Sequence, residues 1–173
     1  MKISADWLNN PSTRSVMKRL VSRGYQAYFV GGCVRNALLN IESKDIDIAT
    51  SAHPKKVLEI MENAELKALP TGIEHGTVTV VANKRSYEIT TLREDIKTDG
   101  RRAKVKFTKS ILEDARRRDF SINAIYSEQD GTILDPLNGI DDILGKRVKF
   151  IGDPYARIKD CLLYTSDAAD DWS

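Results

Sequence analysis

The sequence predicts a mixed α/β fold, of the α/β or α+β class, because apolar residues at helical spacing alternate with short β-branched runs. Two such runs, residues 76–82 and 85–91, are separated only by Asn83-Lys84. This hairpin signal argues against a purely parallel sheet. The chain has 173 residues, 41% of them hydrophobic and 30% charged. That length fits one domain, or one domain and the beginning of another, with enough apolar residues for a packed core.

The first half of the chain gives five predicted elements. Pro11 to Gly24 carries apolar residues at helical spacing, including Val21, and Ser12 is a possible N-cap. A strand rich in apolar and aromatic residues follows and runs into Gly31-Gly32. In order, we expect a helix at 11–24, a strand at 25–30, a helix at 33–39, a strand at 45–50 and a helix at 54–63.

The second half begins with the predicted hairpin and continues with shorter elements. Residues 97–104 are polar, with Asp99-Gly100-Arg101-Arg102 at their centre, which indicates an exposed loop. Beyond it we expect strands at 105–107 and 132–134 and helices at 111–115 and 120–126, the last with Asp119 as its N-cap.

Composition excludes several classes of protein. No run approaches the roughly 18 apolar residues of a membrane helix, and Met1 to Leu8 lacks the apolar stretch of a secretory signal. With two cysteines a disulfide framework is not expected, so free thiols in a reducing cytoplasm are the expectation. His53 and His75 lack zinc-ligand spacing relative to Cys33. A net charge of +2 is compatible with a polyanionic partner without establishing one.

Asp45 and Asp47 form the first candidate site. On a strand, residues two apart project from one face, about 6.6 Å apart along the chain. Two like charges on one face repel, and a divalent cation between them relieves that repulsion. Mg²⁺ prefers one or two carboxylates together with substrate phosphates. The pair therefore indicates a magnesium site, with a solvated strand face as the alternative.

Three further segments carry candidate chemistry. Gly31-Gly32, before a predicted helix, would let a phosphate approach the backbone, and Arg35 would add a forked donor. A tight turn with a surface arginine is an equally good interpretation. Glu88 would complete a carboxylate triad if its strand neighbours that of Asp47, and is otherwise an exposed strand glutamate. The arginines at 116–118 would grip a triphosphate or form a solvated basic surface.

Taken together, these segments resemble the class II nucleotidyltransferases, specifically bacterial tRNA nucleotidyltransferases (CCA-adding enzymes) and their poly(A) polymerase relatives. The resemblance covers about residues 28–160. It rests on six motifs in order: Gly31-Gly32-Cys33-Val34-Arg35, Asp45-Ile46-Asp47, Tyr87-Glu88-Ile89-Thr90-Thr91, Asp99-Gly100-Arg101-Arg102, Arg117-Arg118-Asp119-Phe120-Ser121-Ile122-Asn123-Ala124 and Asp135-Pro136-Leu137-Asn138-Gly139.

The resemblance implies a nucleotidyltransferase head domain at residues 1–145, built on a mixed five-stranded sheet flanked by helices. It implies that Asp45 and Asp47 bind catalytic Mg²⁺, that Glu88 is the third catalytic carboxylate, and that Gly32, Arg35 and Arg118 contact the incoming CTP or ATP. The expected reaction is attack of the tRNA 3′-hydroxyl on the α-phosphate, with release of pyrophosphate. The expected partners are the tRNA 3′ end, CTP and ATP, and no membrane.

The sequence departs from the family at two places. Asn36 stands where the family usually has an aspartate after the motif arginine, and it would hold Arg35 more weakly. Residues 146–160 are expected to begin a truncated neck domain, and residues 161–173 resemble a translated sequencing adapter and are expected to be non-native. The fragment alone is then expected to be inactive or impaired.

Other functions stay open at this stage. A CC-adding enzyme, an A-adding enzyme or a bacterial poly(A) polymerase would share the same chemistry. The 99–102 loop and the His75-Gly76-Thr77-Val78 strand entry favour the CCA-adding enzymes. A non-catalytic nucleotide- or RNA-binding module, with an inert acidic pair, is the alternative from a different class.

Overall fold

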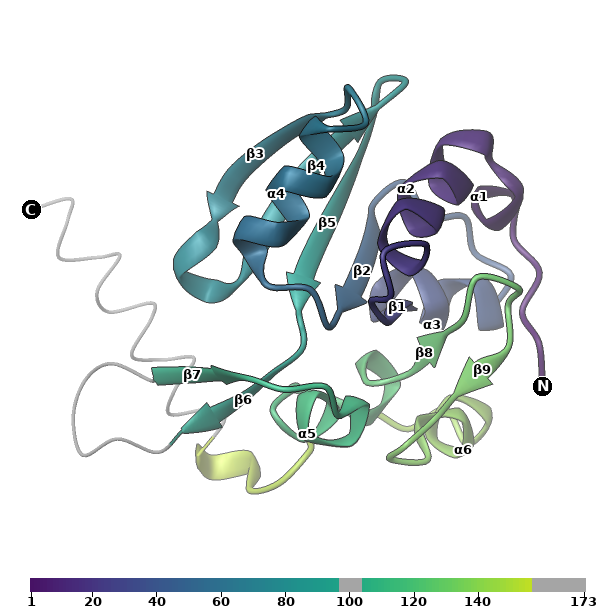
Figure 1. Ribbon diagram of the computed structural model, residues 1–173. Helices are drawn as coiled ribbons and strands as arrows, with labels where there is room; N and C mark the ends of the chain where they lie inside the picture. Colours follow the sequence, from purple (N-terminus) through teal and green to yellow (C-terminus); the bar gives the residue numbers. More distant parts are fainter. Residues whose placement is uncertain (97–103, 157–173) are drawn as a thin grey trace, which may run out of the picture.

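A seven-stranded mixed sheet organises the computed structural model, which describes residues 1–96 and 104–156 (Figure 1). The spatial order of its strands is β3-β4-β5-β2-β1-β8-β9. Strands β2 and β5 pair in parallel, and the other neighbours pair antiparallel. The bounds are β1 Ala27–Val30, β2 Ile46–Thr50, β3 Lys67–Gly72, β4 Thr77–Ala82, β5 Arg85–Thr91, β8 Tyr126–Ser127 and β9 Ile133–Leu134.

The α/β class and the mixed sheet are thus confirmed. Five of the strands, β3, β4, β5, β2 and β1, form the sheet that the family resemblance implied, and β8 and β9 extend it by two strands of two residues each. A separate two-stranded ribbon joins β6 (Arg93–Ile96) to β7 (Lys104–Phe107). Its Phe107 ring packs edge-on against His53, with 4.8 Å between the ring centroids.

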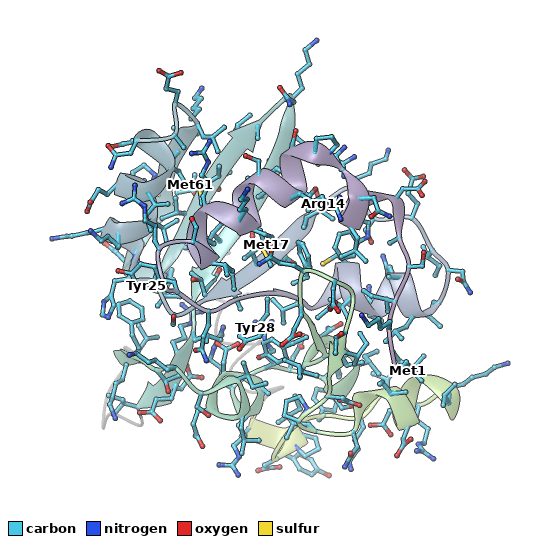
Figure 2. All side chains as sticks on the ribbon, turned by 45° about the vertical axis from the view of Figure 1, so that its right-hand side comes forward. Met1, Arg14, Met17, Tyr25, Tyr28 and Met61 are labelled. Carbon is cyan, nitrogen blue, oxygen red and sulfur yellow. The ribbon has the colours of Figure 1, made fainter. Side chains whose placement is uncertain are left out.

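Helices α2 and α4 cover one face of the central strands, and α5 packs against the other. The helix bounds are α1 Asp6–Asn9, α2 Pro11–Val21, α3 Gly32–Leu38, α4 Pro54–Glu62, α5 Ile111–Arg116 and α6 Gly139–Leu144, with short 3₁₀ turns η1 Ile73–His75 and η2 Ser121–Asn123. Met17 of α2 and Met61 of α4, both fully buried and labelled in Figure 2, join Ile46, Ile48 and Tyr87 of the sheet in the larger core.

The opposite face of the sheet has a smaller core. Ala49 of β2 and Val30 of β1 pack there with Ala115 of α5 and with Tyr126 of β8. Because side chains alternate along a strand, Asp47 shares this face with Ala49, and Ile46 and Ile48 point to the larger core. The candidate acidic residues therefore lie on the side of the sheet that α2 and α4 leave uncovered.

The hairpin signal is confirmed. Strands β4 and β5 pair through Ala82 and Arg85, and both turn residues, Asn83 and Lys84, have positive φ angles of 49° and 63°. Two left-handed residues in a two-residue turn match the right-handed twist of the flanking strands, as in a type I′ hairpin.

Three predictions of local structure are wrong. Residues 120–126 do not form a helix, because Ser121 donates its N–H to Lys149 and Phe120 pairs with Phe150 in an isolated bridge. Ser12 is not the N-cap of α2, since the Asn10 side chain accepts a hydrogen bond from the Ser12 N–H. Val21, placed on the apolar stripe of that helix, is 42% exposed.

Within residues 1–96 and 104–156, no helix is long and apolar enough to cross a membrane. The predicted loop around Asp99–Arg102, the segment 157–160 and the expected non-native tail at 161–173 lie outside the described residues.

Candidate active site

Asp47 and Glu88 lie side by side on the face of the sheet opposite α2 and α4. They are register partners in the parallel pair of β2 and β5, and residues in register on neighbouring strands point to the same face. Asp45 is exposed and sits one residue before β2 begins, on the same parity as Asp47. The condition set for Glu88, a strand adjacent to that of Asp47, is therefore met.

The three carboxylates act on one another electrostatically. The pKa of Asp47 is raised first by its partial burial and then by the negative charge of Glu88 and of Asp45, while the nearby Arg118 opposes the shift. No hydrogen bond or ion pair joins any of the three carboxyl groups to another residue of the described ranges. These oxygens are thus free to accept a ligand that carries positive charge.

The Gly31-Gly32 turn brings the backbone close to this acidic pair. Gly31 has φ 76° and ψ −134°, a backbone conformation that would be strained for any residue with a side chain. A Cβ at Gly31 would lie 3.8 Å from Asp47 Oδ2 and 3.9 Å from Arg118 Nη1. A carboxylate and a guanidinium therefore both lie next to the backbone of this turn. Gly32 begins α3 and lies beside Arg35, whose Nη2 would be 3.7 Å from a Cβ there.

Arg35 is held in place by two asparagines. Asn36 Oδ1 accepts hydrogen bonds from Arg35 Nε (3.2 Å) and Nη2 (3.0 Å), and Asn123 Oδ1 accepts one from Nη1 (2.7 Å). Asn36 is itself fixed, because its Nδ2 donates to Ser43 Oγ at 3.1 Å. The amide at position 36 thus orients the arginine in a two-pronged geometry, with no charge on the acceptor.

Arg118 lies beside the same glycine turn. Its Nη2 donates to Asp114 Oδ2 at 3.0 Å, and its Nε donates to the Tyr126 hydroxyl at 3.2 Å. The guanidinium also lies over the Tyr126 ring, 5.5 Å from the centroid. Of the three consecutive arginines, Arg117 also binds Asp114, and Arg116 pairs with Glu113 on the exposed side of α5.

Sequence reasoning missed Asp114, Asn123 and Tyr126 as parts of this site. Asp114 lies three and four residues before Arg117 and Arg118, a spacing at which side chains on a helix meet, so its pairing had a readable signal. Asn123 was noted only within a motif, and Tyr126 had no signal because its position depends on the pairing of β8 with β1.

The acidic face suits a cation that brings ligands of its own. In the described part of the chain, no three His, Cys, Asp or Glu residues are grouped to hold a metal by themselves. Asp45, Asp47 and Glu88 nevertheless concentrate negative charge where burial already raises the pKa of Asp47. Because Mg²⁺ commonly takes one or two carboxylates and completes its shell with water and phosphate, this donor set fits it.

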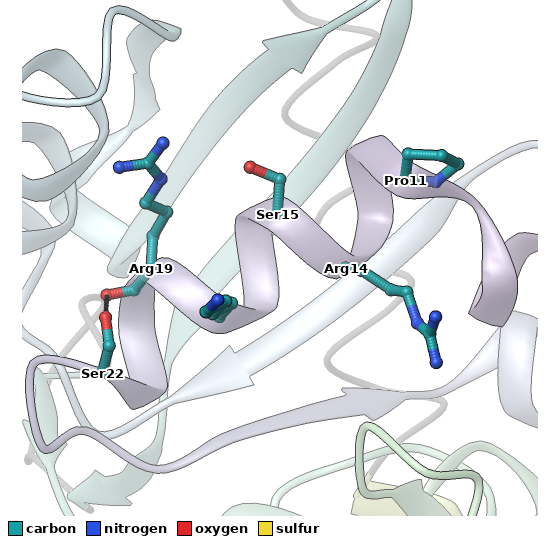
Figure 3. A pocket seen from close by; sticks show the side chains of 6 residues that line it. Pro11, Arg14, Ser15, Arg19 and Ser22 are labelled. Carbon is teal, nitrogen blue, oxygen red and sulfur yellow. Dashed lines mark hydrogen bonds between the residues drawn. The ribbon is translucent and has the colours of Figure 1, made fainter.

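A separate groove lies on the outer side of α2, lined by Pro11, Arg14, Ser15, Lys18, Arg19 and Ser22 (Figure 3). Since the inner side of α2 packs on the larger core, this groove is across the sheet from Asp47. It contributes nothing to the acidic site.

Comparison with known proteins places this geometry in a family. The poly A polymerase head domain family matches residues 27–149, which include the glycine turn, all three carboxylates and both arginines. The chain belongs to this family. Among curated relatives of this head domain, the CCA-adding enzyme of Limosilactobacillus fermentum is 42% identical over 158 residues, covering 90% of this chain and 38% of the relative. The chain thus spans less than two fifths of that relative's length.

Solved structures agree with the assignment to this head domain family. The CCA-adding enzyme of Bacillus stearothermophilus in complex with CTP superposes with a TM-score of 0.80 at 36% identity, over 92% of this chain and 37% of that one. A tRNA nucleotidyltransferase complexed with a primer tRNA and an incoming ATP analog gives a TM-score of 0.61 at 27% identity, over 79% of this chain and 39% of the other.

Proposed function

We propose that this head domain is the nucleotide-binding and catalytic part of a CCA-adding enzyme, which transfers CMP and AMP from CTP and ATP to the 3′ end of tRNA. The observation that carries the proposal is the placement of Asp47 and Glu88 side by side, with Asp47 and Arg118 both next to the Gly31 turn. This arrangement puts an acidic face for a metal next to a fixed positive charge for phosphate. The similarity to CCA-adding enzymes supports the choice of substrates.

In this proposal Asp45 and Asp47 hold Mg²⁺ and Glu88 is the third catalytic carboxylate. Bound Mg²⁺ would neutralise phosphate charge and lower the pKa of the attacking hydroxyl. Glu88 is in register with Asp47 and its side chain is exposed, so it is available to a hydroxyl that approaches from solvent.

Arg35, Arg118 and Gly32 form the nucleotide-binding part of the proposal. Both guanidinium groups are already hydrogen-bonded on one edge, so little side-chain entropy remains to be lost when phosphate binds. Negative charge redistributes over phosphate oxygens during transfer, and preoriented donors stabilise it without rearrangement. Gly32 leaves the space beside Arg35 open to a ligand.

The deciding experiment measures Mg²⁺-dependent incorporation of labelled CMP and AMP into a tRNA that lacks its terminal CCA. Because the chain spans 38% of its Limosilactobacillus relative, the chain is assayed alone and fused to the remainder of that enzyme. The fusion is expected to add both nucleotides. Asp45→Ala and Asp47→Ala are each expected to lower incorporation by about 100-fold or more.

Glu59→Gln is the matched control, because it removes an exposed carboxylate, paired with Lys56 on α4, from the opposite side of the sheet. Its incorporation rate should equal that of the parent. Addition of a long run of AMP would show a poly(A) polymerase instead, and unchanged turnover in both aspartate variants would show that the catalytic site lies elsewhere.

A further inference from the structure

Asp114 is a fully buried carboxylate that the proposed reaction does not use directly. Its side chain is 1% exposed, at the junction of α5, β6 and β8. Burial of a carboxylate is costly unless charges and hydrogen bonds compensate it. The residues that contact Asp114 therefore show how the fold compensates for burying its charge.

Both carboxylate oxygens of Asp114 are saturated with donors. Oδ1 accepts hydrogen bonds from the Arg93 N–H (3.1 Å) and from Arg117 Nε (2.9 Å). Oδ2 accepts from the Tyr126 hydroxyl (2.7 Å) and from Arg118 Nη2 (3.0 Å) and Nε (3.3 Å). Although burial acts to raise the pKa of Asp114, the charges of Arg118 and Arg117 and the Tyr126 hydrogen bond lower it overall. Asp114 is therefore ionised at neutral pH.

The contact with Asp114 fixes one edge of the Arg118 guanidinium and leaves the other edge facing the acidic site. Nε and Nη2 point to Asp114 and to the Tyr126 hydroxyl. The remaining nitrogen, Nη1, lies 3.9 Å from the point where a Cβ on Gly31 would be, and Asp47 Oδ2 lies 3.8 Å from that same point. The hold on the opposite edge thus keeps Nη1 at the Gly31 turn, which Asp47 Oδ2 also approaches.

Tyr126 completes the support beneath Arg118. Its hydroxyl accepts from Arg118 Nε and donates to Asp114, so the three side chains form a closed hydrogen-bonded ring. The side chain of Arg118 is only 18% exposed, and its Cζ lies 5.5 Å from the Tyr126 ring centroid. With neighbours on these sides, the guanidinium has little room to turn when a ligand arrives.

We propose that Asp114 is a positioning residue, which acts through Arg118 by holding the Nη1 edge of the guanidinium at the place where nucleotide phosphate binds. This inference rests on the proposed function and extends it beyond the residues that touch substrate. One negative charge on Asp114 also faces two guanidinium groups, Arg117 and Arg118, which leaves positive charge for a phosphate to compensate.

The test is a double-mutant cycle on the affinity of the 173-residue chain for CTP in the presence of Mg²⁺, measured by isothermal titration calorimetry. Asp114→Asn keeps the size of the side chain and removes its charge and one acceptor. It is expected to weaken CTP binding by about tenfold, as the loss of a side chain that orients a ligand-binding residue typically does. In an Arg118→Gln background the same substitution is expected to change the Kd by less than about twofold. A change of that size is within the deviation from additivity seen for sites that do not interact.

Three controls separate this role from a general structural one. Glu113→Gln removes the neighbouring carboxylate of α5, paired with Arg116, and should leave CTP affinity unchanged. In an Arg117→Gln background, Asp114→Asn should still weaken binding by its full factor, because Arg117 is not the residue through which Asp114 acts. Cytidine, which lacks phosphate, should bind the parent and Asp114→Asn equally.

If Asp114→Asn melts below the assay temperature, Tyr126→Phe takes its place, since it removes the hydroxyl from the ring of hydrogen bonds and keeps the aromatic core. It is expected to weaken CTP binding in the parent and not in the Arg118→Gln background. Equal losses in both backgrounds, or no loss in the parent, would overturn the positioning role. A parent that binds no CTP either alone or in the fusion would instead refute the proposed function, and with it this inference.

Discussion

Asp47 on β2 and Glu88 on β5 are register partners in the one parallel ladder of the described sheet, and their carboxyl groups stand on the same face. Burial and the charges of Glu88 and Asp45 raise the pKa of Asp47, so the folded chain binds a proton there more tightly than the unfolded chain does. The corresponding stability is present at low pH and is lost as the pH rises through the folded-state pKa. At neutral pH the acidic face therefore opposes folding.

Replacing Asp47 with asparagine should stabilise the fold at neutral pH, because it removes a partly buried charge that faces two other carboxylates. We expect the melting temperature at pH 7 to rise by roughly 2 °C. The difference in melting temperature from the parent should narrow as the pH falls through the raised pKa of Asp47, where the parent carboxyl also becomes neutral. Scanning calorimetry checks both, and a lower melting temperature for Asp47→Asn at pH 7 would contradict the electrostatic account.

Magnesium should also stabilise the parent chain, because a bound cation relieves the repulsion between these carboxylates. A ligand that binds only the folded state raises its melting temperature in proportion to ln(1 + [L]/Kd). We expect millimolar MgCl₂ to raise the melting temperature of the parent, EDTA to reverse the rise, and Asp45→Asn or Asp47→Asn to abolish it. KCl at matched ionic strength controls for screening, and an equal rise with KCl would argue against a specific site.

The two glycines of the turn should respond differently to alanine. Gly31→Ala forces a Cβ onto a residue with φ 76°, and we expect it to cost about 1–3 kcal/mol of unfolding free energy. Gly32→Ala is the matched control: it lies in α3, where a Cβ meets Arg35 Nη2 at an ordinary 3.7 Å, and should cost little. Urea unfolding of both variants measures the difference, and equal costs would show that the backbone conformation of Gly31 is not the cause.

Changing Asn36 should change nucleotide affinity through Arg35. Asn36→Ala removes the acceptor of two Arg35 hydrogen bonds, and we expect a loss of about 1 kcal/mol, roughly fivefold in the Kd for CTP. Asn36→Asp should bind CTP at least as tightly as the parent, because a carboxylate holds a guanidinium by charge-assisted hydrogen bonds. Titration calorimetry on the two variants checks the order, and its reversal would show that Asn36 serves the fold rather than Arg35.

The hairpin turn offers a test of stability away from the site. Lys84 adopts φ 63°, which is unfavourable for a residue with a side chain by roughly 1 kcal/mol, so Lys84→Gly should raise the unfolding free energy by up to that amount. Chemical denaturation measures the change. CTP affinity should stay constant, and a change in it would link the hairpin to the site.

Much of the sheet was readable from local periodicity, and the exceptions have physical causes. Strands β4 and β5 alternate between buried and more exposed residues, and β2 does so from Ile46 to Ile48, which is the signal that periodicity detects. Strand β3 is mostly exposed and contains Pro70, which a strand at the edge of a sheet tolerates and a pattern search rejects. Tyr126, the first residue of β8, was predicted as the end of a helix, because the pairing of β8 with β1 is a tertiary contact that the local sequence does not show.

In the candidate site, too, some residues could be identified from local sequence patterns and others depend on tertiary contacts. Asp45, Asp47 and Glu88 were identifiable because strand parity fixes the face on which each side chain lies. That the two strands are neighbours could be stated only as a condition. The network around Arg118 depends on where Tyr126 and the β1–α3 turn meet in space, and no local pattern encodes that meeting.

The last partner of β1 to be synthesised is β8, whose Tyr126 and Ser127 pair with Val30 and Phe29. During translation the outer edge of β1 is therefore unpaired, and Arg118 has no tyrosine to rest on, until Ser127 has left the ribosome. Local hairpins such as β4–β5 can close earlier, because their contacts span few residues. A nascent chain thus completes the support beneath Arg118 only when β8 has paired with β1, after most strands of the sheet have been synthesised.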